Sequence, residues 1–146
     1  MGLGGGFDFI GRVMAEGLTK QIPGGSFVVE NQAGLGTLIG TQAASTATPD
    51  GCTLLVGGLS NLVFNTALYK TLSYDARSDF VPVAAPVMAQ LRTALVASMQ
   101  NVELRKRLEQ GGIETMDLKP AETDAFLKSE YNRWTGVIKQ AGITVE

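Results

Sequence analysis

Three glycine-rich turns divide the first half of this chain, and each precedes a segment suited to helix formation. The turn at residues 4–6 comes before an apolar stripe, from Ile10 to Leu18, with the i, i+3, i+4 spacing of an amphipathic helix. The turn at residues 34–36 leads into a run of small residues, and the turn at residues 57–58 leads into a short helical pattern. Because glycine permits tight backbone turns, this pattern favours a fold built from short, alternating elements.

Three short apolar runs have the composition of strands, and they occupy residues 27–30, 53–56 and 80–83. The last third of the chain contains two long helical stripes, the first with a kink near Asn101. Helices that alternate with short strands are typical of an α/β layer sandwich with a mainly parallel sheet. We therefore predict this fold class.

Composition excludes several classes of function. The 146 residues include no histidine and a single cysteine, Cys52. Without histidine the common Ser-His-Asp and Cys-His arrangements are unavailable, and one cysteine cannot hold a structural zinc ion. The net charge is −2, with no basic stripe that would follow a phosphate backbone. We expect a single globular domain that is not an enzyme, holds no metal or cofactor, and binds no nucleic acid.

An alternative interpretation is a nucleotide-binding site at the second glycine turn, and the spacing of its glycines tests this interpretation. Gly34, Gly36 and Gly40 follow an apolar run and open a helix, as in dinucleotide-binding proteins. The spacing is one residue longer than G-x-G-x-x-G, and no acidic residue closes a second strand about twenty positions later. A nucleotide-dependent enzyme that uses residues 34–40 is therefore disfavoured.

The turns at residues 4–6 and 57–58 are more alike, since both precede a helix. Helix starts present unpaired N–H groups and the positive end of the helix dipole, and glycines let a ligand approach that backbone. Two such turns side by side would form a small anion site without lysine or arginine. The simpler interpretation is that the glycines only permit tight turns, while Asp8 and Ser60 cap their helices. The residues alone leave both interpretations open.

Four motifs carry a resemblance to a known family. They are GGGFDFIGR at residues 4–12, VVENQAGLGTLIG at residues 28–40, PDGCTLL at residues 49–55 and NTALYK at residues 65–70. In this order and spacing they resemble the Bug family, the substrate-binding receptors of tripartite tricarboxylate transporters. Residues 102–108 and 120–143 resemble the closing helices of that family.

The resemblance implies one Rossmann-like lobe of a type II periplasmic-binding-protein fold, in which two lobes close on a small carboxylate. It implies a periplasmic receptor that performs no reaction and passes its ligand to a membrane permease. Such receptors hold the ligand largely through main-chain N–H groups, hydroxyls and ordered water. The ligand contacts carried over to this chain are Gly4, Gly5, Gly6, Phe7, Asp8, Gly58, Leu59, Ser60, Asn61 and Asn65.

From comparison with the family pattern, we expect this chain to lack the signal peptide, the first strand and the second lobe. Residues 1–87 then correspond to the opening half of one lobe, and residues 88–146 to the helices that complete it. A lobe without its central strand leaves backbone groups unpaired, so we expect a homodimer or larger assembly formed by strand complementation. Half of a cleft should bind its carboxylate weakly. The alternative is an oligomerising structural module that has lost ligand binding.

Overall fold

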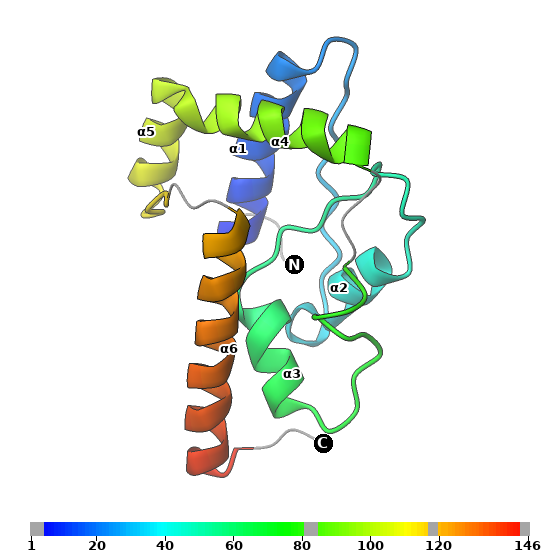
Figure 1. The fold of residues 1–146 in the computed structure, drawn as a ribbon, viewed down its shortest axis with the longest axis vertical. Coiled ribbons are helices and arrows are strands. Elements are labelled where there is room, and N and C mark those ends of the chain that lie inside the picture. Colours follow the sequence, from blue (N-terminus) through cyan, green and yellow to red (C-terminus); the bar gives the residue numbers. More distant parts are fainter. Residues whose placement is uncertain (1–4, 81–84, 117–119, 144–146) are drawn as a thin grey trace.

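The computed structural model describes residues 5–80, 85–116 and 120–143, and these residues are predominantly helical (Figure 1). The prediction of a helix after each glycine turn is confirmed, and so is the break near Asn101. The elements are α1 (Gly6–Gln21), the 3-10 turn η1 (Leu35–Thr37), α2 (Leu38–Ser45), the π-helical turn η2 (Ser60–Phe64), α3 (Asn65–Leu68), α4 (Ala85–Gln100), α5 (Val102–Gln110) and α6 (Pro120–Ala141).

The helices α1, α4 and α5 form the main packed body, with α4 lying across α1 (Figure 1). The apolar stripe of α1 meets both partners. Val13 packs with Leu104 and Leu108 of α5, whereas Leu18 packs with Leu91 and Ala94 of α4. All six side chains are buried. The periodicity visible in the sequence therefore supplies the core face of α1.

A second group of contacts joins α6 to η2 and α3. Trp134 of α6 meets Phe64 of η2 edge to face, with the ring centroids 5.1 Å apart. Ile138 is buried further along α6. In Figure 1, α6 runs alongside α3. The long C-terminal helix therefore supports the segment that directly follows the turn at residues 57–58.

The predicted parallel sheet is wrong: the described residues form a helical structure and no α/β lobe. Residues 27–30 and 53–56 lack helical structure and form no ladder, and Tyr69 is the one isolated bridge residue in the described ranges. Most of the third predicted strand, residues 81–83, lies outside the described residues. An apolar segment becomes a strand only when a neighbour supplies hydrogen bonds. The described part of the chain supplies none to these two segments, which explains the error.

The same two segments nevertheless lie together against α1. A Cβ atom placed on Gly11 would lie 3.4 Å from a methyl carbon of Val29 and 3.6 Å from a methyl carbon of Val56. Other apolar side chains of these segments point to solvent, since Val28 is 88% exposed and Leu54 is 47% exposed. Each segment thus has one valine packed on the helix and apolar surface left uncovered.

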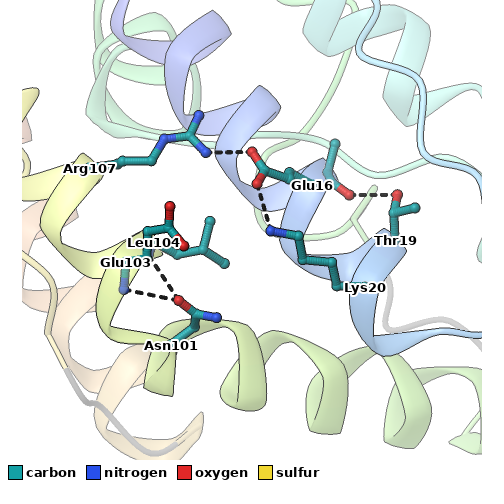
Figure 2. A network of polar contacts seen from close by, with 8 residues as sticks. Glu16, Thr19, Lys20, Asn101, Glu103, Leu104 and Arg107 are labelled. Atoms are coloured by element: carbon teal, nitrogen blue, oxygen red, sulfur yellow. Dashed lines mark hydrogen bonds and ion pairs between the residues drawn. The ribbon is translucent and has the colours of Figure 1, made fainter.

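Polar contacts fix the corner between α1, α4 and α5 (Figure 2). Asn101 is the N-cap of α5, and its side-chain oxygen accepts hydrogen bonds from the N–H groups of Glu103 (3.0 Å) and Leu104 (3.2 Å). Glu16 of α1 pairs with Lys20 one turn later, at 2.8 Å, and with Arg107 of α5. The Glu16–Arg107 ion pair links α1 to α5 through two residues that are 91 positions apart in the sequence.

We expect stability to depend on pH through Glu16. Hydrogen bonds from Lys20 and Arg107 lower the pKa of Glu16 from 4.5 to about 2. Its charged form is therefore favoured in the folded state, so its contribution is complete above pH about 4.5 and is lost as pH falls through about 2. Thermal melts between these pH values should show a shallower fall in melting temperature for Glu16→Gln than for the unchanged chain.

The comparison with Glu16→Gln isolates this one carboxylate. Hydrogen bonding from the backbone of Arg77 also lowers the pKa of Asp75, but that carboxylate is present in both proteins and its effect cancels. Parallel pH profiles for the two proteins would show that the Glu16 ion pairs contribute nothing in solution, as is common for exposed pairs.

Candidate functional site

The two glycine turns that the sequence singles out lie next to each other. A Cβ atom placed on Gly58 would lie 2.8 Å from Cζ and 2.9 Å from Cε1 of Phe7. The turn before η2 therefore packs directly against the first turn of α1, and a side chain at position 58 would collide with the Phe7 ring. Gly4 lies outside the described residues, whereas Gly5 and Gly6 stand at the start of α1.

The first turn of α1 has no side-chain cap. Gly5 is the N-cap residue and has an extended conformation. As a glycine, it has no side chain that could accept a hydrogen bond from the first N–H groups of the helix. Asp8 is therefore not the N-cap that the sequence suggested, because the helix begins at Gly6 and Asp8 lies within its first turn. An uncapped start of a 16-residue helix presents N–H donors and the positive end of the dipole.

The Asp8 side chain makes contacts that hold the start of α1 against a neighbouring segment of the same chain, at residue 31. Its side chain is only 8% exposed, and Oδ1 lies 3.0 Å from a guanidinium nitrogen of Arg12 one turn along the helix. The same oxygen accepts a hydrogen bond from Nδ2 of Asn31, which follows the extended segment at residues 27–30. The buried charge is thus paired and hydrogen-bonded, which removes most of the penalty of burying it. Asp8 therefore fixes the start of α1 against residue 31.

Asn61 organises the turn that contains Gly58. Its side chain is fully buried, and Oδ1 accepts a hydrogen bond of 2.8 Å from the N–H of Gly58. The Nδ2 group donates at 3.2 Å to Oγ1 of Thr41 on α2. The Gly58 amide is consequently used inside the turn. Ser60 does not cap η2 either, since the N-cap position is Leu59 and no side chain caps it.

The remaining predicted contact, Asn65, belongs to a buried polar network. Its Nδ2 group donates to Oγ1 of Thr37 and to the hydroxyl of Tyr74, both at 3.2 Å. The Tyr74 hydroxyl donates to the main-chain oxygen of Asn61 at 2.7 Å. Sequence reasoning missed Thr37, Thr41 and Tyr74, because isolated polar residues carry no periodic signal. The structure brings them together with Asn61 and Asn65.

The hydroxyl oxygen of Ser60 is buried and has no hydrogen-bond partner among the described residues. Ser60 is the first residue of η2, directly after Leu59, which is 36% exposed. Buried hydroxyls are normally satisfied by protein or by ordered water. An orphaned hydroxyl in this turn marks a donor that a ligand atom or a water molecule can satisfy.

The turn at residues 34–37 does not offer the open cradle of a nucleotide site. Gly34 has a φ of 141°, and a Cβ atom there would lie 2.4 Å from Cδ1 of Ile39. The Ile39 side chain therefore fills the space over this glycine. Leu35 and Thr37 also have positive φ angles, of 44° and 84°, which are uncommon for residues with side chains. Filled space and an irregular turn disfavour close approach of a pyrophosphate group.

The described residues contain neither a membrane-spanning helix nor a cluster of metal ligands. None of the helices in these ranges reaches the length and apolarity that a bilayer span demands. In the same ranges, no three acidic or cysteine side chains gather where they could hold a metal ion.

Comparison with known proteins gives a consistent result. Residues 10–86, more than half of the chain, match the family model described as tripartite tricarboxylate transporter family receptor. A UPF0065 protein of Bordetella bronchiseptica is 38% identical over 104 residues, which are 70% of this chain and 31% of that protein. Protein BugT of Bordetella pertussis is 38% identical over 82 residues, covering 56% of this chain and 25% of its own length.

A UPF0065 protein of Pseudomonas sp., from the tcbD-tcbE intergenic region, is 36% identical over 93 residues, which are 64% of this chain and 26% of that protein. This chain therefore spans about a third or less of the length of these curated relatives. No solved structure matches.

Proposed function

Because this chain belongs to the tripartite tricarboxylate transporter receptor family, we propose that it carries one face of a binding site for a small carboxylate. The bound solute would pass to the membrane permease of a tripartite transporter, so the protein binds and performs no reaction. The periplasm is the compartment in which such a receptor meets its ligand. The observation that carries the proposal is the contact between Gly58 and Phe7, which brings the two glycine turns together.

The chemistry of the joined turns suits an anion. The start of α1 has no side-chain cap, and its dipole favours negative charge at this end. The Ser60 hydroxyl adds a donor without a partner among the described residues. Asp8 is paired with Arg12 and Asn31, which offsets the repulsion that its carboxylate would exert on an anion. Main-chain amides and one hydroxyl can therefore hold a carboxylate here.

The affinity of this chain for a carboxylate should be low. A carboxylate held from one side stays largely hydrated, and its contacts must offset the entropy lost on binding. The contacts proposed here come from the two glycine turns alone, and we expect dissociation constants in the millimolar range. Isothermal titration calorimetry with citrate, malate, succinate and glutamate tests this. Heat of binding for at least one of them supports the proposal, whereas none up to tens of millimolar contradicts it.

Replacing Ser60 by alanine should separate binding from stability. The hydroxyl has no partner among the described residues, so its removal relieves a desolvation penalty and should leave stability unchanged or raise it by about 1–2 kcal/mol. The same change removes a ligand donor and should raise the dissociation constant about three- to tenfold. Chemical denaturation and calorimetry measure the two effects.

Thr135→Val provides the matched control. Thr135 on α6 has the other buried hydroxyl oxygen that lacks a partner in the described residues. Its loss should affect stability in the same direction as Ser60→Ala and leave carboxylate binding unchanged. Equal binding by Ser60→Ala and the unchanged chain would remove Ser60 from the site.

A second function, self-association, is favoured by the amount of uncovered surface. The chain exposes 9522 Å², whereas a compact monomer of this mass exposes about 7,200 Å². Part of the excess lies on the segments at residues 27–30 and 53–56, with Val28 88% exposed. Because the main chain of these segments forms no ladder in the described residues, a strand from a second copy could pair with them. We propose a homodimer formed by this strand complementation.

Val28→Lys should weaken that dimer strongly. A charged side chain on an unpaired segment opposes pairing with another chain. Analytical ultracentrifugation should show a dimer for the unchanged chain and a monomer for the variant at the same concentration. Val102→Lys serves as the control, since Val102 is 79% exposed at the start of α5, outside both segments. A monomeric unchanged chain would contradict the proposed dimer.

A further inference from the structure

A buried tyrosine hydroxyl connects to the turn at residues 57–61 from outside it. Tyr74 is 5% exposed and lies in the connection after α3. Its hydroxyl donates to the main-chain oxygen of Asn61 at 2.7 Å and accepts from Nδ2 of Asn65 at 3.2 Å. Asn61 in turn accepts the N–H of Gly58, the residue that packs against Phe7. Asn61 thus links the Tyr74 hydroxyl to Gly58, where the two glycine turns meet.

The backbone that Tyr74 contacts has an irregular helical geometry. The N–H of Asn65 donates to the main-chain oxygen of Ser60, five residues earlier, so this turn is a π-helix. Such turns are rare, occur frequently at functional sites, and need support from the surrounding structure. A hydroxyl donor aimed at the Asn61 carbonyl supplies that support directly. Removing it would leave this carbonyl without its external donor.

The network also reaches the neighbouring turn at residues 34–37. Asn65 donates to Oγ1 of Thr37, whose φ of 84° is uncommon for a residue with a side chain. The main-chain oxygen of Thr37 accepts from Oγ1 of Thr41, and that same hydroxyl accepts from Asn61. Tyr74, Asn65 and Asn61 therefore belong to one connected set of hydrogen bonds that holds two turns in fixed conformations.

We propose that Tyr74 is a positioning residue for carboxylate binding: its hydroxyl holds Asn61, and through Asn61 the Gly58 amide, in the conformation that places residues 57–61 beside Phe7. The inference rests on the proposed function. In this proposal Tyr74 does not contact the ligand; it fixes the backbone of residues 57–61, which carries the Ser60 hydroxyl. Networks of this kind reduce the ordering cost of binding, because the turn is arranged before the ligand arrives.

Tyr74→Phe tests the inference with a minimal change. The variant keeps the ring and its edge contact with Phe80, at 6.2 Å between centroids, and loses only the hydroxyl. In the ligand-free protein, hydrogen exchange followed by NMR should show the Gly58 amide exchanging about tenfold faster, because the bond to Asn61 opens more often. The dissociation constant for the tightest-binding carboxylate of the panel should rise by a similar factor.

The control is Tyr131→Phe. Tyr131 lies on α6, and its ring stays under the Arg77 guanidinium, 5.7 Å away, in the variant as well. This change removes a tyrosine hydroxyl outside the network and should alter neither Gly58 exchange nor carboxylate binding. If Tyr74→Phe fails to fold, Thr41→Val replaces it, because this nearly isosteric change removes the acceptor of Asn61 Nδ2 and should open the same turn.

Each outcome of these measurements decides one claim. Faster exchange confined to residues 57–61, together with weaker binding, supports the positioning role. Unchanged Gly58 exchange, or an equal increase in the amides of α1 and of residues 57–61, overturns it, since the second result marks a general loss of stability. Binding equal to that of the unchanged chain also overturns it. If the unchanged chain binds no carboxylate, the proposed function fails, and the exchange data still decide whether Tyr74 holds the turn.

Discussion

Leu104→Ala is expected to lower the free energy of unfolding by about 2–5 kcal/mol, the range typical of a truncated core leucine. Leu104 is 4% exposed and packs with Val13 of α1 and Leu108 of α5. Its removal leaves a cavity where α1 and α5 meet, beside the side chains of Val13 and Leu108. Urea denaturation followed by circular dichroism measures the change.

Val102→Ala is the matched control for Leu104→Ala. Both residues lie in the first turn of α5, but Val102 is 79% exposed. Its truncation should change the free energy of unfolding by less than about 0.5 kcal/mol. Similar losses for the two variants would show that the α1–α5 contact does not exist in solution.

Gly17→Ala is expected to destabilise the protein by about 1–3 kcal/mol, although alanine normally stabilises a helix interior. A Cβ atom at position 17 would lie 2.7 Å from Oγ and 2.8 Å from Cβ of Ser98, and 3.1 Å from Cδ1 of Leu104. Ser98 is 1% exposed on α4, and its hydroxyl donates to the main-chain oxygen of Ala94. Neither helix can move aside without losing core contacts. The added methyl group therefore increases the distance between α1 and α4.

Gly136→Ala is expected to change stability in the opposite direction to Gly17→Ala. Gly136 lies inside α6 with open space where its Cβ atom would be. Alanine should therefore raise stability by about 0.5–1 kcal/mol, from helix propensity alone. A second test pairs Gly17→Ala with Ser98→Gly, which removes both close atoms and should recover most of the loss. If Gly17→Ala proves as stabilising as Gly136→Ala, the close crossing of α1 and α4 is wrong.

The helices could be predicted from the sequence because their signals are local. The stripe from Ile10 to Leu18 records which face of α1 is covered, and Asn101 caps α5 through its own side chain. The strands failed for the opposite reason. Residues 27–30 and 53–56 have the composition of strands, but a strand depends on hydrogen bonds from another segment. Composition does not report whether that segment is present.

The candidate site, like the fold, could be predicted from the sequence only in part. The resemblance to the Bug family pointed to both glycine turns, and Phe7 does lie against Gly58. The partners that fix these turns were not foreseen, because Thr41 and Tyr74 are single polar residues in segments without periodicity. Asp8 and Ser60 were each assigned a capping role as the simpler interpretation, and neither caps its helix in the structure. Burial of a polar group is a tertiary property, which explains these misses.

The edge-to-face contact between Trp134 and Phe64 gives this protein an intrinsic optical signal. Trp134 is the sole tryptophan, and Phe64 is the last residue of the π-helical turn that begins at Ser60. The indole N–H donates to Glu130 at 2.8 Å, so the ring is held in place on α6. Any shift of the turn must therefore change the surroundings of one fluorophore, and its emission reports the state of residues 60–64 without an attached dye.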